Sequence, residues 1–160
     1  MPKPLTITTP GDRDVVVTRE FDAPRDLVFL CYSKPELMRR WYGLPDWTMP
    51  VCEIDFRVGG KWRFVSRSPD GYEMGSQGVY THITAPERID QTEYYDDDWT
   101  QGGSVNSVVF SEKGGRTTTT LTITYSSSEA RAAALATPMA VGMEIGFKRL
   151  DALLADEQKP

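Results

Sequence analysis

The chain has 160 residues, of which 39% are hydrophobic and 26% are charged, and its formal net charge is −5. A chain of this size and composition can bury a core of its own, which excludes an intrinsically disordered protein. No stretch approaches the 18 consecutive apolar residues of a membrane-spanning helix, and the acidic balance argues against nucleic-acid binding.

Residues 1–12 contain three prolines and a Gly-Asp pair, which predicts a flexible N-terminal lead-in to a single domain at residues 13–157. This segment lacks the apolar core of a signal peptide. Cys31 and Cys52 are too few for a disulfide framework. We therefore expect a cytoplasmic protein with two buried free thiols.

The alternating pattern of residues 15–21 predicts a first strand, which ends before Pro24. Pro24 suits the first turn of a helix, and the apolar run at residues 27–32 continues it. Residues 33–43 begin with the spacing of a capping box and end at Gly43, so they predict a second short helix.

From about residue 48 to residue 126 the apolar pattern has a period of two, which predicts consecutive antiparallel strands joined by turns. The first two strands form a hairpin around the Gly-Gly pair at 59–60, with Trp62 and Phe64 on its apolar face. The acidic run at residues 96–98 is typical of a solvated loop rather than a metal site.

The last strand of this region has Leu121, Ile123 and Tyr125 on one side and threonines on the other. A sheet with one apolar face needs a cover over that face. After a short helix near residues 126–136, Pro138 starts a long helix that we expect to run to about Asp156 and to supply the cover.

Apolar residues of this long helix recur at intervals of four and three, which gives one narrow stripe of Met139, Met143, Phe147, Leu150 and Leu154. Glycine costs about 1 kcal/mol relative to alanine in a helix interior. Gly142 and Gly146 therefore predict that something approaches the helix backbone closely.

Six local strings span nearly the whole chain: REFDAP at 19–24, PELMRRWYG at 35–43, DFRVGGKWRF at 55–64, PDG at 69–71, GVYTHITAPERI at 78–89 and GMEIGFKRLDALLA at 142–155. Together and in this order, they resemble the START-like superfamily, in particular the family named after the activator of the heat-shock-protein-90 ATPase. Single-domain bacterial members of this family are often uncharacterised, and the eukaryotic namesake stimulates a chaperone by means of a further domain.

The resemblance implies an α+β, helix-grip fold. In this fold a curved antiparallel sheet of about six or seven strands wraps around a long C-terminal helix, and two short helices follow the first strand. It also implies an apolar cavity between sheet and helix, of the kind that holds lipids, polyketides or other hydrophobic small molecules. Phe147 stands where many relatives carry tryptophan, which bears on the shape of the cavity rather than on the fold.

Strand alternation and this resemblance select nine candidate ligand-binding residues: Trp41, Tyr42, Trp47, Trp62, Phe64, Glu93, Met139, Met143 and Phe147. The aromatic and methionine side chains are expected to face the space between sheet and helix, where they suit a pocket wall or plain core packing. Glu93 is expected to point inward, where it would orient a ligand or hydrogen-bond to its neighbours.

His82 is the only histidine of the chain. If Val79, Thr81 and Ile83 face the long helix, His82 lies on the outer surface, and we expect no catalytic residue there. One histidine and two separated cysteines do not make a zinc ligand set, and the glycine pairs lack the pattern of a phosphate loop. We expect neither a metal nor a cofactor.

The leading expectation is a module that binds a hydrophobic small molecule without catalysis of its own, without nucleic acid and without membrane insertion. Two alternatives stay open: a cyclase-like or hydrolase-like enzyme that uses the inward carboxylate, and a module that regulates a chaperone. Periodicity does not select the ligand or the oligomeric state.

Overall fold

The computed structural model describes residues 2–99 and 102–160. The strands are β1 (Thr6–Thr8), β2 (Asp14–Phe21), β3 (Thr48–Ile54), β4 (Lys61–Arg67), β5 (Glu73–Thr84), β6 (Arg88–Tyr95), β7 (Ser104–Lys113) and β8 (Arg116–Tyr125). The helices are α1 (Arg25–Ser33), α2 (Pro35–Trp41), α3 (Ser128–Leu135) and α4 (Met139–Glu157).

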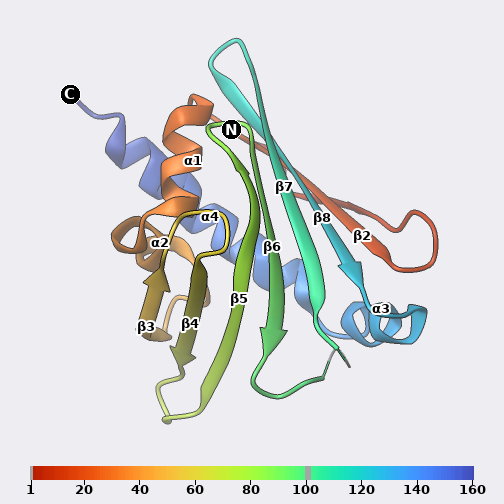
Figure 1. Ribbon diagram of the computed structural model, residues 1–160. Helices are drawn as coiled ribbons and strands as arrows, with labels where there is room; N and C mark the ends of the chain where they lie inside the picture. Colours follow the sequence, from red (N-terminus) through yellow and green to blue (C-terminus); the bar gives the residue numbers. More distant parts are fainter. Residues whose placement is uncertain (1, 100–101) are drawn as a thin grey trace.

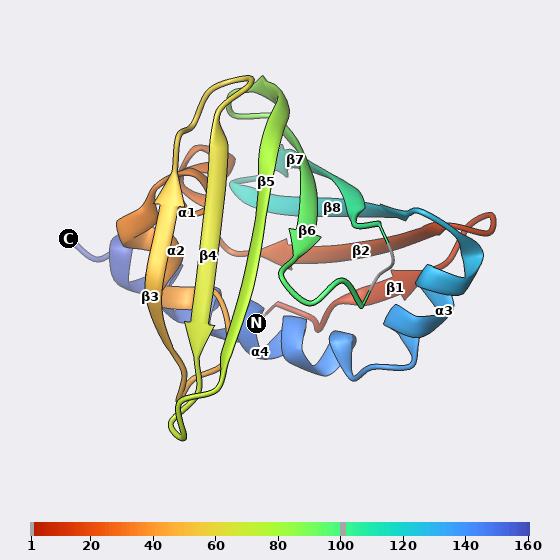
Figure 2. The ribbon, with the colours of Figure 1, turned by 60° about the horizontal axis from the view of Figure 1, so that its bottom comes forward.

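All strands pair antiparallel in one sheet, with the order β1-β2-β8-β7-β6-β5-β4-β3. The sheet is curved, and α4 crosses its concave side, with α1 and α2 beside one end of that helix (Figures 1 and 2). This arrangement confirms the predicted helix-grip fold, with one strand more than expected. The extra strand is β1, in which Ile7 lies opposite Val17 of β2.

The hairpin of β3 and β4 has the face that the sequence predicts. Cys52 lies opposite Phe64 and Ile54 lies opposite Trp62, so these four side chains share one side of the sheet. Trp62 and Phe64 are buried at 1% and 5% exposure. The pair therefore covers the concave side, as the period of two requires.

The facing considered for β5, with Val79, Thr81 and Ile83 toward the long helix, is wrong for Val79 and for Thr81, which is exposed. Tyr80 is the buried residue there, and a β-bulge lies between Tyr80 and His82. Because a bulge adds one residue to a strand, Tyr80 before it and Ile83 after it both pack against the core. His82 is exposed, as expected, and its Nε2 lies 2.8 Å from Thr84 Oγ1.

Helix α4 has a buried half and a loosely covered half. Its buried residues are Gly146, Phe147, Leu150, Leu153 and Leu154, all in the C-terminal part, where it packs on α2 and α1. None of the described helices is both long and apolar enough to span a membrane.

The close approach predicted from the two helix glycines is not found. A Cβ on Gly146 would lie 3.6 Å from Trp41 O, an ordinary contact. Apart from the backbone of the same helix, no atom of the described residues lies within 4 Å of the place a Cβ on Gly142 would take. Alanine therefore fits at both positions.

Strand β2 is tied to α4 by a buried arginine. The Arg19 guanidinium donates hydrogen bonds to Glu144 at 3.0 Å and to Asp151 at 2.8 Å, both on α4. It also lies over the rings of Phe21 and Phe147, 5.0 and 5.8 Å from their centroids. These contacts hold the helix against one edge of the concave face.

Candidate functional site

A row of neighbouring residues crosses the middle of the concave face from β4 to β8. The row contains Trp62, Gly78, Glu93, Ser104 and Tyr125, and all its steps are strand pairs except that from Gly78 to Glu93. Glu93 is placed across from Gly78 by the pairs on either side, Gln77 with Tyr94 and Tyr80 with Gln91. Aromatic rings thus stand at both ends of the row, and a carboxyl group stands between them.

Glu93 is buried, at 8% exposure. Its Oε1 accepts a hydrogen bond from Asn106 Nδ2 at 3.3 Å, and the Tyr95 hydroxyl also hydrogen-bonds to it. Burial raises the pKa of this carboxyl, and the bonds from Asn106 and Tyr95 oppose that rise only in part. Glu93 therefore keeps its proton to a higher pH than an exposed glutamate does.

Three tyrosines lie close enough to Glu93 for an electrostatic interaction with its carboxyl group: Tyr42, Tyr95 and Tyr125. Burial is the main cause that raises the pKa of each hydroxyl, to about 12 for Tyr125, and Glu93 adds to the rise. All three hydroxyls are therefore neutral near pH 7. No cationic side chain of the described residues hydrogen-bonds to Glu93.

Trp62 contributes a buried donor without a partner. Among the described residues, its indole Nε1 is the one fully buried side-chain nitrogen or oxygen that makes no hydrogen bond. A buried polar group of this kind costs free energy unless something pairs with it.

The rim of this region is apolar and incompletely covered. Met139 and Met143 of α4 and Leu121 of β8 pack on the core while staying half-buried. Tyr42 is 36% exposed although its hydroxyl lies in a buried environment, so its solvent contact comes from the rest of the residue. Its ring centroid lies 5.3 Å from that of Phe64.

Three of the nine predicted residues lie elsewhere. Trp41 and Phe147 stack in the closed core, with centroids 6.4 Å apart, and Trp41 Nε1 donates to Cys31 O at 2.9 Å. Trp47 lies in the loop between α2 and β3, with its ring edge-on to Tyr72. The structure thus brings Tyr42, Trp62, Phe64 and Glu93 together. Met139 and Met143 of α4 pack against the same core.

Sequence reasoning missed the polar side chains of β7. Ser104 Oγ hydrogen-bonds to Asn106 Oδ1 at 3.1 Å, which links both residues to Glu93. The signal was present in the sequence, because Ser104 and Asn106 alternate in phase with the buried Val108 and Phe110.

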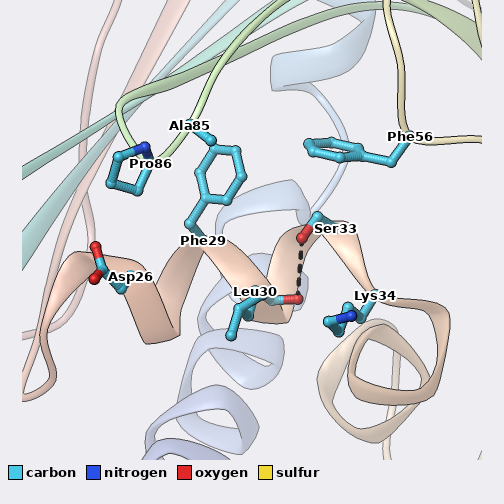
Figure 3. Close-up of a pocket in the computed structure, with 8 residues that line it drawn as sticks. All are labelled: Asp26, Phe29, Leu30, Ser33, Lys34, Phe56, Ala85 and Pro86. Atoms are coloured by element: carbon cyan, nitrogen blue, oxygen red, sulfur yellow. Dashed lines mark hydrogen bonds between the residues drawn. The ribbon is translucent and has the colours of Figure 1, made fainter.

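Two open surface hollows lie mainly outside the concave face. One, of about 570 Å³, lies beside α1, where Phe29 points toward Ala85 and Pro86 and Phe56 lies across from it (Figure 3). The other, of about 450 Å³, lies mainly along the convex side of β4, β5 and β6, although Trp62 and Gly78 of the concave row also line it. Neither contains Glu93 or the α4 methionines, so the concave row is the better candidate site.

The acidic run makes no metal site among the residues that the structure describes. Asp96 pairs with Arg63 at 2.8 Å on the surface, and Asp98 Oδ1 accepts a hydrogen bond from Gly102 N. Two of the three carboxylates in the run, Asp96 and Asp98, are therefore surface groups with protein partners.

Comparison with known proteins gives a family match and several similar folds. The family model described as activator of Hsp90 ATPase homolog 1-like protein matches residues 22–155. A protein from Rhodobacter sphaeroides has a solved structure with 27% identity and a TM-score of 0.91, covering 96% of this chain and 99% of that one.

Two further structures are similar along their whole length. Protein Ms6760 from Mycobacterium smegmatis has 25% identity and a TM-score of 0.83, covering 94% of this chain and 97% of its own. A protein from Staphylococcus epidermidis has 26% identity and a TM-score of 0.82, covering 97% and 96%. Curated protein sequences give no significant match.

Proposed function

The chain belongs to the family of activator of Hsp90 ATPase homolog 1-like proteins, and on this basis we propose that it binds a hydrophobic small molecule on its concave face. The ligand is of the lipid, polyketide or aromatic metabolite class. It lies between the sheet and the N-terminal half of α4.

The observation that carries this proposal is the loose cover over the concave face. Within α4, no residue before Gly146 is fully buried. Met139 and Met143 face the core yet stay half-buried, and the space beside Gly142 is open. A helix that served only to close a core would pack this half as tightly as the other.

The residues of the site divide into contacts and supports. The rings of Trp62 and Phe64 on the sheet, together with Tyr42 at the end of α2, form one wall, and methionine supplies an adaptable wall on α4. In this proposal Trp41 and Phe147 support the wall from the closed core without touching the ligand, and Trp47 takes no part.

A substitution on α4 tests this placement, after native mass spectrometry has found a binder among fatty acids, polyketides and aromatic metabolites. Met143→Trp fills the space under the helix and should weaken binding at least tenfold. Val141→Trp is the matched control on the same helix, because Val141 is 63% exposed and points away from the core. Equal affinity in both variants, or no binder in the screen, would refute the proposal.

The buried carboxyl favours one second function. A glutamic acid that keeps its proton at higher pH can act as a general acid toward a molecule held beside it. In that case Glu93→Gln would retain the ligand and abolish its conversion, which mass spectrometry of incubated ligand would show.

The proposal places this activity in the cytoplasm. Cys31 and Cys52 are both free and buried, as is usual for proteins of a reducing compartment. Fractionation of cells with a specific antibody would test this location.

A further inference from the structure

The unpartnered Trp62 indole and the buried Glu93 carboxyl lie on neighbouring parts of the concave row. Trp62 is on β4 and lies opposite Gly78 of β5, while Gly78 lies opposite Glu93 of β6 by the register of the two strands. Only the residue at position 78 stands between them, and it has no side chain.

The Trp62 ring uses the space that Gly78 leaves. A Cβ on Gly78 would lie 2.7 Å from Trp62 Nε1 and 1.8 Å from Thr92 O, so position 78 must be glycine. At this point β5 and β6 also depart from the regular ladder, because Val79 N donates to Thr92 Oγ1 at 3.0 Å. The indole N–H is therefore held against β6, with no side chain of β5 in front of it.

The Glu93 carboxyl group has hydrogen-bonding positions that the described residues do not fill. A carboxyl group has about four acceptor positions, or one donor and the remaining acceptors when it carries its proton. Asn106 supplies one long bond and Tyr95 a second. The Trp62 N–H does not bond to Glu93, since it has no partner among the described residues.

We infer that Trp62 and Glu93 form a polar anchor on the concave face for a neutral ligand whose ketone or hydroxyl oxygen accepts a hydrogen bond from the indole. This inference rests on the proposed function, because it names the chemistry of the same site. The apolar body of the ligand extends from this anchor toward the methionines of α4.

The two charged alternatives fit the anchor less well. A carboxylate would place a charge in this buried part of the face, where no cation of the described residues pairs with it. An ammonium group could pair with ionised Glu93, but it has no lone pair for the Trp62 N–H. A carbonyl oxygen has two lone pairs and can accept from the indole and from protonated Glu93 together.

A matched series of probes tests this selectivity at pH 7. The series is 2-acetylnaphthalene, 2-naphthoate and 2-(aminomethyl)naphthalene, which share one ring system and differ in the polar end. Calorimetric titration should show that the ketone binds at least tenfold more tightly than either ion. In Glu93→Gln, which cannot ionise and keeps an amide donor in place of the protonated acid, the ketone should keep its affinity to within threefold.

Nuclear magnetic resonance of ¹⁵N-labelled tryptophan detects directly whether the Trp62 indole N–H gains a hydrogen bond. The Trp62 indole signal, assigned by its loss in Trp62→Phe, should move downfield when the ketone binds. The Trp41 signal is the control, since that indole already donates to Cys31 O.

The outcomes separate the two proposals. If the three probes bind equally, if the carboxylate or the amine binds tightest, or if the Trp62 signal stays in place, the anchor is overturned while the binding function stands. If neither the probes nor the screened metabolites bind at all, the proposed function fails and the anchor fails with it.

Discussion

Two buried ionisable groups on the concave side have opposite surroundings. Arg19 is surrounded by carboxylates, whereas Glu93 has only neutral donors among the residues that the structure describes. Burial raises the pKa of Glu144, one of the carboxylates, but the hydrogen bonds from Arg19 and from Leu5 N outweigh it and the net pKa is lowered. The first arrangement stabilises a charge, and the second favours the uncharged acid.

Glu93 should make the folded protein less stable as the pH rises. The folded state binds its proton more tightly than the unfolded chain does, so the free energy of unfolding falls above the ordinary pKa of 4.5. It levels off once Glu93 is also ionised in the folded state. Glu93→Gln should flatten this decline, as urea midpoints between pH 4.5 and pH 8 would show.

Glu144→Gln is the control with the opposite sign. The lowered pKa of Glu144 contributes stability above its ordinary value of 4.5 and loses it as the pH falls through the folded-state pKa. This variant should therefore be less stable than the parent near pH 7 and similar to it at low pH.

For the Glu93 prediction itself, parallel curves of urea midpoint against pH for the parent and Glu93→Gln would show that Glu93 is not held in its uncharged form.

Gly78→Ala should destabilise the fold by about 2 kcal/mol, because the added Cβ meets the backbone oxygen of Thr92 and the Trp62 ring. Gly75→Ala is a matched control on the same strand. Its Cβ meets Asp96, an exposed side chain that can turn away at the loss of a surface ion pair worth less than about 1 kcal/mol. Equal losses in chemical denaturation would contradict the packing described for Trp62.

At the scale of elements, the two halves of α4 differ in packing. The C-terminal half is buried against the core, whereas the N-terminal half lies over the concave face without a fully buried residue. Gly142→Ala should stabilise the protein by about 1 kcal/mol, because alanine has the higher helix propensity and its methyl group enters open space. Thermal unfolding with Gly146→Ala as the comparison would check this, since a Cβ there meets Trp41 O at an ordinary distance. A destabilised Gly142→Ala would mean that the space beside the helix is filled.

The elements differ in how far they could be predicted. The β3–β4 hairpin followed from its period of two, and the threonine face of β8 did likewise. The bulge in β5 could not be foreseen, because one inserted residue shifts the facing of every later side chain without a mark in the sequence. Strand β1 was hidden among prolines, and it forms because β2 offers it an edge.

The candidate site was only partly predictable, because a strand pattern shows which side of the sheet a side chain faces but not what packs against it. Strand parity places Trp62, Phe64 and Glu93 on one face, but it does not show which buried rings meet a closed core. Trp41 and Phe147 belong to that core because α4 packs tightly on α2 there. The missing partner of the Trp62 indole depends on the exact distance between strands, which no sequence pattern gives.

At the scale of the whole molecule, the central claim is that a hydrophobic ligand lies between the sheet and the first half of α4. The six methionines of the chain are natural probes of that space. Met139 and Met143 are in the proposed site, and Met74, which is 44% exposed near the β4–β5 turn, is outside it.

The most direct measurement is a titration of protein labelled with ¹³C at the methionine methyl groups, with the ligand that native mass spectrometry identifies. The account predicts that the Met139 and Met143 signals shift as the ligand binds and that the Met74 signal stays in place. Saturable binding that leaves Met139 and Met143 unmoved, or that shifts Met74 alone, would contradict it.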